Sequence, residues 1–434
     1  MTEAMRSAVD PSAVQRRTLR LLFATQIISG IGVAIGASVG ALLAADLAGV
    51  AVSGLAQSAV VVGAALFAVP ATAIVRRYGR RPSLAASYLA AAVGSLVIVV
   101  AAVTGSRAWV FAGFFLFGGA TAAGLQARYA AVDLAPAALR GRHLSIIVWA
   151  TTLGAVAGPQ FAAVAGDALD GFGVPTLAGP FFFSAILFVL AAATLLLFLR
   201  PDPAIVAGTA GAAGAGPTGP ATPDARSGMR AAIRAVAAQP AATLGVSAMA
   251  TGHLVMVGVM AMTPVHIRSA GHGAAQTLHI VGVVLSFHIA GMYALSPVMG
   301  WLTDRLGRQP VILTGIALLL IACAVVGGAG HSAKHLAAGL LVLGAGWSAT
   351  TVAGSTLLSE SVAPDLRAAA QGLSDLTMGL AGAAAGALSG AVVQVWGYPT
   401  LTLLAALATV PVIGMVAFRT APRGDRRATP APRA

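Results

Sequence analysis

The feature that most constrains this chain is a series of twelve apolar runs, each about as long as a helix that crosses a membrane. Such a helix needs about 20 mostly apolar residues. Only 9% of the residues are charged, against about 25% in soluble domains, so a soluble enzyme is excluded. The sequence predicts an all-α membrane protein with twelve transmembrane helices. The runs are Leu19–Leu43, Val52–Val75, Ser83–Val103, Trp109–Val132, Leu144–Ala165, Leu177–Leu199, Ala241–Pro264, Thr277–Met299, Pro310–Gly330, Leu336–Leu358, Gln371–Val395 and Leu401–Phe418.

Basic residues lie mainly on one side of the predicted bundle. That side carries Arg6, Arg16, Arg17, Arg20, Arg76, Arg77, Arg80, Arg81, Arg140, Arg142, Arg200, Arg226, Arg230, Arg234, Arg305, Arg308, Arg367 and five arginines of the C-terminal tail. The other side carries only Arg107, Arg268 and Lys334. By the positive-inside rule, both termini lie in the cytoplasm, and we expect the cytoplasmic (inner) membrane. Topology thus explains the net charge of +13, and we expect no nucleic-acid partner.

A segment rich in Gly, Ala, Pro and Thr, Pro201–Gly228, separates the first six runs from the last six. We expect an N-terminal half at 1–199, a cytoplasmic linker at 200–240, a C-terminal half at 241–420 and a cytoplasmic tail at 421–434. Within the linker, Met229–Ala238 is either a short surface helix or more linker.

The two halves repeat each other. Gly79-Arg80-Arg81-Pro82 recurs as Gly307-Arg308-Gln309-Pro310, and Pro136 recurs as Pro364 at the same offset of 228 residues. Two related six-helix halves are typical of alternating-access transporters.

The segment Gly300-Trp-Leu-Thr-Asp304-Arg305-Leu-Gly307-Arg308 resembles the loop motif of the major facilitator superfamily, and the twelve-helix plan covers nearly the whole chain. The resemblance implies that Asp304, Arg305 and Arg308 belong to a cytoplasmic charge latch with a gating role. The first-half copy departs from the motif, because Thr72 and Arg76 stand where Gly and Asp are expected.

Histidine and methionine are concentrated in the seventh and eighth runs and the loop between them. Five of the 8 histidines lie there (His253, His266, His272, His279 and His288), as do six of the 11 methionines (Met249, Met256, Met260, Met262, Met292 and Met299). Met249, His253, Met256 and Met260 fall within an arc of roughly 60° on a helix. His288, Met292 and Met299 share a face by the same arithmetic, whereas Met262 points away from its stripe.

These residue types predict a site for a soft metal ion. Thioether sulfur selects Cu(I) among biological metals, while zinc favours Cys or carboxylate and magnesium favours oxygen. Neutral ligands leave Cu⁺ its single charge, which an inside-negative potential draws inward by about 2.3 kcal/mol per 100 mV. The alternative interpretation is that the methionines fill the core and the histidines bond neighbouring helices.

Met256-x-x-x-Met260 and His288-x-x-x-Met292 resemble the paired motifs of a major-facilitator subfamily of bacterial copper importers that serve cytochrome oxidase assembly. The resemblance implies that Met256, Met260, His288 and Met292 are required for uptake and that transport is directed inward. Geometry adds His253 and Met249 to the predicted ligands.

Other polar residues leave alternatives open. Asp375, within the eleventh run, is interpreted as a proton or gating residue or as a residue that makes a hydrogen bond at the start of its helix. Arg128 and Asp133 are interpreted as a gating or structural pair. Cys323 permits no internal disulfide, and we leave it out of the site.

The hypothesis is therefore a copper importer, with copper as substrate and no cofactor. We expect a monomer in the lipid bilayer that delivers copper to a cytoplasmic chaperone.

The alternative is a proton-coupled exporter of drugs or small metabolites, favoured by Gly154-Ala-Val-Ala-Gly158-Pro159, which resembles an antiporter motif but also suits close helix packing. A non-transporting copper receptor is a further alternative. We expect no enzyme, since no nucleotide loop, nucleophile constellation or carboxylate pair stands out.

Overall fold

A computed structural model describes residues 10–136, 139–207, 225–363 and 366–420, and within these ranges it contains helices and no strands. Twelve segments are long and apolar enough to cross a membrane, which confirms the predicted twelve-helix membrane fold. The linker residues 208–224 and the tail 421–434 lie outside the described residues.

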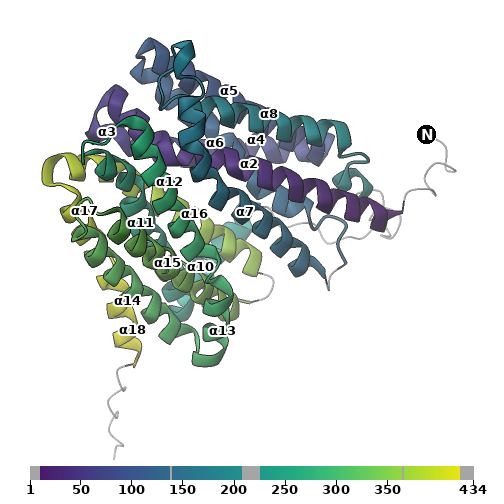
Figure 1. Ribbon diagram of the computed structural model, residues 1–434. Coiled ribbons are helices and arrows are strands. Elements are labelled where there is room, and N and C mark those ends of the chain that lie inside the picture. Colours follow the sequence, from purple (N-terminus) through teal and green to yellow (C-terminus); the bar gives the residue numbers. More distant parts are fainter. Residues whose placement is uncertain (1–9, 137–138, 208–224, 364–365, 421–434) are drawn as a thin grey trace, which may run out of the picture.

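The first six spans comprise α2 to α8 (Figure 1). Pro11 opens the first helix, where its missing N–H costs no hydrogen bond, and Asp10 accepts a hydrogen bond from the backbone N–H of Ser12 at 2.8 Å. The bounds are α2 Pro11–Ala48, α3 Val50–Ser53, α4 Leu55–Tyr78, α5 Arg80–Thr104, α6 Arg107–Ala130, α7 Arg140–Asp167, η2 Asp170–Phe172 and α8 Gly179–Phe198.

The last six spans comprise α11 to α18 and are preceded by α10 (Ala225–Ala238), which is a helix over the whole of the segment left open by the sequence. Ala232 and Val236 of α10 are buried against residues of α11, α15 and α16. The bounds are α11 Pro240–Arg268, α12 Ala274–Tyr293, α13 Ser296–Leu306, α14 Arg308–Gly327, α15 Ala333–Ser361, α16 Arg367–Trp396, α17 Tyr398–Leu407 and α18 Val410–Thr420.

The repeat predicted from the sequence has a structural counterpart. Gly79 and Gly307 separate the second span from the third and the eighth from the ninth, and their φ angles are +94° and +93°. Both values lie in a region that glycine occupies at little cost. The two halves therefore make the same tight turn 228 residues apart.

The two halves meet at the end of the bundle opposite the ends of α2 and α18 that lead to the chain termini. There α3 and α4 pack on α16, α7 packs on α12, and α2 packs on α11. The backbone N–H of Ala51 donates to Gln394 Oε1 at 2.6 Å, and Arg268 pairs with Asp46 at 2.6 Å. Figure 1 shows the halves diverging from this region toward the start of α2 and the end of α18.

Small residues make this close approach of the halves possible. A Cβ atom on Gly282 would lie 2.6 Å from the carbonyl oxygen of Pro159, and one on Gly390 would lie 2.5 Å from that of Val50. The assembly is therefore closed at the end opposite the chain termini.

Candidate functional site

Three of the predicted ligands come together in the second half. Met256 and Met292 are buried, with exposed fractions of 4% and 9%, and Met260 packs against them. Met256 and Met260 lie one turn apart on α11, and Met292 lies in the last turn of α12. We call Met256, Met260 and Met292 the methionine cluster.

The eighth span is interrupted directly beside this cluster. Helix α12 ends at Tyr293, and α13 begins at Ser296 with Pro297 in its first turn. Proline lacks a backbone N–H and suits the first turn of a helix better than its interior. Discontinuous helices at the centre of a bundle are a feature of transporter binding sites.

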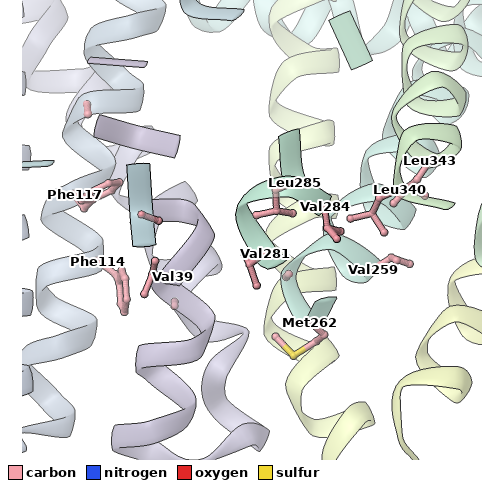
Figure 2. Packing of buried hydrophobic residues seen from close by; sticks show 14 of the residues in the cluster. Val39, Phe114, Phe117, Val259, Met262, Val281, Val284, Leu285, Leu340 and Leu343 are labelled. Atoms are coloured by element: carbon pink, nitrogen blue, oxygen red, sulfur yellow. The ribbon is translucent and has the colours of Figure 1, made fainter. Parts of the chain in front are cut away.

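His288 is fully buried one turn before Met292. Its Nδ1 lies 2.9 Å from the carbonyl oxygen of Leu340 on α15, and its Nε2 has no hydrogen-bond partner in the described part of the chain. Because a carbonyl only accepts, Nδ1 carries the proton and Nε2 keeps its lone pair. Many metal-ligating histidines are held in this way by a carbonyl. Figure 2 shows Val284 of α12 and Leu340 of α15, the residue that pairs with His288, within one packed hydrophobic cluster.

His253 lies beside the cluster but has a partner of its own. The indole Nε1–H of Trp347 donates to His253 Nδ1 at 3.2 Å, and the two ring centroids lie 6.4 Å apart. The other edge of the imidazole is close to α16, since a Cβ atom on Gly382 would lie 3.0 Å from Nε2.

Met249 lies apart from the other predicted ligands. It is buried in a separate cluster that includes Val236 of α10 and Leu358 of α15, and the hydroxyl of Ser374 lies 3.6 Å from its sulfur. Met262 is fully buried in the main core, as its position off the stripe predicted, with the Ser53 hydroxyl 3.5 Å from its sulfur.

Two aromatic residues that the sequence pattern did not indicate complete the surroundings of the cluster. Trp347 of α15 and Tyr293 of α12 pack against it, with ring centroids 6.1 Å apart in an edge-to-face arrangement. The available signal was a tryptophan near the middle of an apolar span, next to Gly344 and Gly346.

Among the described residues, no group of three or more His, Cys, Asp or Glu is close enough to hold a metal ion. Cys323 is buried in the core and lies outside the methionine cluster.

A small cavity of about 90 Å³ lies between the two halves. Met260 of the second half lines it, together with Gln57, Thr121, Phe114 and Phe117 of the first half. Sites for drug-sized ligands are ~300–1,000 Å³. In this state the cavity therefore has room for an ion with a few waters and not for a large organic molecule.

The predicted pairing of Arg128 with Asp133 is wrong. Asp133 instead makes a two-pronged ion pair with Arg80, with distances of 2.8 and 2.9 Å, and Gln126 accepts a further hydrogen bond from Arg80 at 2.9 Å. Both charged side chains are about 15% exposed. Asp133 lies three residues beyond the end of α6, off the helix that carries Arg128, and Arg80 reaches it from the first residue of α5.

Asp375 lies eight residues after the start of α16, and its side chain is exposed, with no hydrogen bond to the described residues. The alternative interpretation of Asp375, a hydrogen bond to the first backbone N–H groups of its helix, is therefore not formed within the described part of the chain. Arg128 approaches Asp375 and Tyr293 closely enough for electrostatic interaction.

The second-half loop motif forms an ion pair. Arg308 donates to Glu360 of α15 through Nε at 2.9 Å, and its Nη1 donates to the carbonyl oxygen of Thr303 at 3.2 Å. Arg305 lies 5.2 Å over the ring of Trp301, and Asp304 is exposed.

At the end of the bundle where the two halves meet, His266 and His331 stack on each other and do not surround a metal position. The ring of His266 lies between Tyr398, at 4.3 Å, and His331, at 4.9 Å. His266 Nε2 lies 2.7 Å from the carbonyl oxygen of Gly330, and Ser269 lies 3.1 Å from His331. The stack joins the end of α11 to the start of α17.

The glycines of the antiporter-like motif lie where α7 crosses α2. A Cβ atom on Gly158 would lie 2.6 Å from that of Ala34 and 2.8 Å from the carbonyl oxygen of Ile31. These residues therefore permit close packing of the two helices.

Known proteins share this architecture. The family model of the Major Facilitator Superfamily matches residues 21–284 and 272–434. The uncharacterized MFS-type transporter YdeG of Bacillus subtilis is 37% identical over 94% of this chain and 92% of its own length. The riboflavin transporter RfnT of Brucella anthropi is 27% identical over 96% of this chain and 98% of its own. The crystal structure of the nucleoside transporter NupG superposes with a TM-score of 0.69 at 16% identity, covering 94% of this chain and 99% of that one. The chain is therefore a multi-pass membrane protein that belongs to the major facilitator superfamily of alternating-access secondary transporters.

Proposed function

We propose that this transporter imports copper as Cu(I). The observation that carries the proposal is the packing of three methionine side chains from α11 and α12 against one another, one helical turn from His288, whose Nε2 has no hydrogen-bond partner among the described residues. Each motif contributes to this group: Met256 and Met260 come from one, and His288 and Met292 from the other.

The chemistry of the group favours a soft monovalent ion. Thioether and neutral imidazole bind Cu(I) well, and the methionine cluster contains no carboxylate that would favour magnesium or calcium. Mid-membrane sites must bind strongly enough to admit an ion and weakly enough to release it. Uncharged ligands of this kind suit exchange better than a closed cage of thiolates does.

The proposal also includes the direction of transport, from the outside to the cytoplasm. With cytoplasmic termini, the closed end faces the outside, and the methionine cluster releases copper inward to a cytoplasmic chaperone. The small cavity lined by Met260 lies between the cluster and the first half.

Uptake by purified protein tests the proposal. Proteoliposomes should accumulate Cu(I), supplied anaerobically with ascorbate, when the interior is negative. Met256→Leu with Met292→Leu should abolish uptake, because leucine keeps nearly the same volume and removes the sulfur. Met262→Leu is the matched control, since Met262 is buried on the same helix outside the cluster.

Two results would contradict copper import. One is the absence of copper uptake by the native protein under a negative-inside potential. The other is equal uptake by the double variant and the Met262→Leu control, which would make the methionines packing residues.

A second candidate is transport of a planar organic metabolite. Tyr293, Trp347 and His253 offer aromatic surface beside the cluster, and a relative that aligns over nearly its full length is named a riboflavin transporter. Riboflavin uptake is measured in a strain that cannot make riboflavin, and uptake would favour this candidate over copper import. Drug efflux is measured in the same strain, and efflux would favour the exporter alternative.

A further inference from the structure

Trp347 approaches the methionine cluster because α15 packs unusually close to α12. A Cβ atom on Gly344 would lie 2.7 Å from the backbone nitrogen of Met292, so only glycine permits this approach. Trp347 follows one turn later on α15. Its indole consequently packs directly against the methionine cluster while part of the ring stays exposed.

The orientation of the indole is fixed by a single hydrogen bond. Trp347 Nε1–H donates to His253 Nδ1 at 3.2 Å. An indole nitrogen only donates, so Nδ1 of His253 must present its lone pair and the proton resides on Nε2. That lone pair is therefore used by the tryptophan and is not free for a metal ion.

A cation bound by the cluster would keep its charge. The three thioethers and the neutral imidazole of His288 add no charge that would cancel that of the ion. The electron-rich face of an indole is the strongest cation-binding surface among the aromatic side chains, and the interaction grows when water is excluded. Tyr293 packs edge-to-face on Trp347 and limits the movement of the indole.

We propose that Trp347 is a further binding residue of the copper site, which covers the ion through a cation–π contact, and that His253 is a positioning residue for the indole rather than a copper ligand. This inference rests on the proposed copper transport. It separates the two histidines by role, with His288 as ligand and His253 as anchor.

Binding measurements on the purified full-length transporter test the assignment. Silver nitrate serves as a redox-stable probe for Cu(I), and competition with a Cu(I) chelator gives the copper affinity. The other four tryptophans, Trp109, Trp149, Trp301 and Trp396, are more than half exposed and are replaced with phenylalanine so that fluorescence reports Trp347 alone.

The variants are expected to differ in a graded way. Trp347→Leu should weaken binding about 10-fold, a change that corresponds to about 1.4 kcal/mol, and Trp347→Phe should weaken it less because a π face remains. Silver should quench and shift the Trp347 fluorescence. His253→Ala should reduce that spectral change and weaken binding several-fold, whereas His253→Gln, which retains an acceptor oxygen, should restore both. Trp149→Leu in the native background is the control for loss of a tryptophan.

The outcomes separate this inference from the proposed function. If Trp347→Leu, eluting as a folded protein, binds copper like the native protein while the Met256→Leu and Met292→Leu double variant does not, the cation–π role is overturned and copper transport stands. If His253→Gln loses binding as completely as the double variant with Trp347 fluorescence unchanged, His253 is a ligand and not an anchor. If the native protein binds neither ion, both proposals fall together.

Discussion

Replacing Gly390 with alanine should weaken the contact that closes the bundle. The added Cβ atom would lie 2.5 Å from the carbonyl oxygen of Val50 and 2.7 Å from that of Ala51, about 0.9 Å short of the 3.4 Å at which ordinary contact begins. Both atoms belong to the backbone, so no side chain can rotate away. Overpacking of this kind costs about 1–3 kcal/mol, and each 1.4 kcal/mol changes an equilibrium tenfold. The closed end should therefore open about 5- to 150-fold more often.

The folded state itself should not suffer from this change. Alanine is favoured over glycine in a helix interior by about 1 kcal/mol, and this gain is present whether the end is closed or open. Only the closed state contains the clash. The expected result is a shift in the balance of conformations without loss of protein.

A cysteine reporter measures that shift. In a background with Cys323→Ala, a cysteine in place of Ala261, which lines the small cavity and is 7% exposed, should react faster with a membrane-impermeant thiol reagent supplied from outside. Gly372→Ala is the matched control, because Gly372 lies on the same helix and its added Cβ meets no atom of a neighbouring described element within 4 Å. Equal labelling rates in the two alanine variants would refute the role of this contact in closure.

Three further outcomes follow from the polar contacts. Asp133→Asn should lower the melting temperature in detergent and reduce the free energy of unfolding by about 2–4 kcal/mol, because the nearly buried Arg80 then lacks its carboxylate partner. Adding Arg80→Gln to the same chain should recover part of that stability. Asp46→Asn should raise labelling of the same reporter about 1.4- to 5-fold, since its exposed pair with Arg268 contributes about 0.2–1 kcal/mol. High salt, about 1 M, should reproduce the change only while Asp46 is present. Asp202→Ala should cost about 1–2 kcal/mol by thermal unfolding, because the Asp202 carboxylate accepts hydrogen bonds from the first backbone N–H groups of α5, and Asp202→Asn should cost less.

The twelve spans and the two halves could be predicted from the sequence because a bilayer permits few alternatives. Every backbone polar group in the hydrocarbon region must be paired within the chain, so a long apolar run has to be a helix. The breaks inside spans were not predicted. The interruption after Tyr293 depends on one proline and a few residues around it, which a count of apolar residues does not detect.

The candidate site was only partly predictable for a physical reason. Periodicity gives the residues that share a face of one helix, but not the helix that covers each part of that face. Met249 and Met256 lie seven residues apart on α11, or about 10 Å along its axis, and α10 covers the first while Trp347 covers the second. Likewise, nothing local indicated that the Nδ1 atom of His253 would be taken by an indole from a third helix.

If copper is the cargo, as proposed above, the position of the methionine cluster limits how its binding can drive transport. A cargo shifts the balance between two states only if it binds them unequally, so ligands confined to one rigid half would hold the ion without favouring either state. Met260 is the member of the cluster that also lines the cavity against Gln57, Thr121 and Phe117 of the first half. Its surroundings must change when the halves rock, while those of Met256 and Met292 within the second half can stay constant. The proposed copper transport therefore predicts that cargo binding and movement of the halves are coupled at Met260, where the two halves face each other across the small cavity.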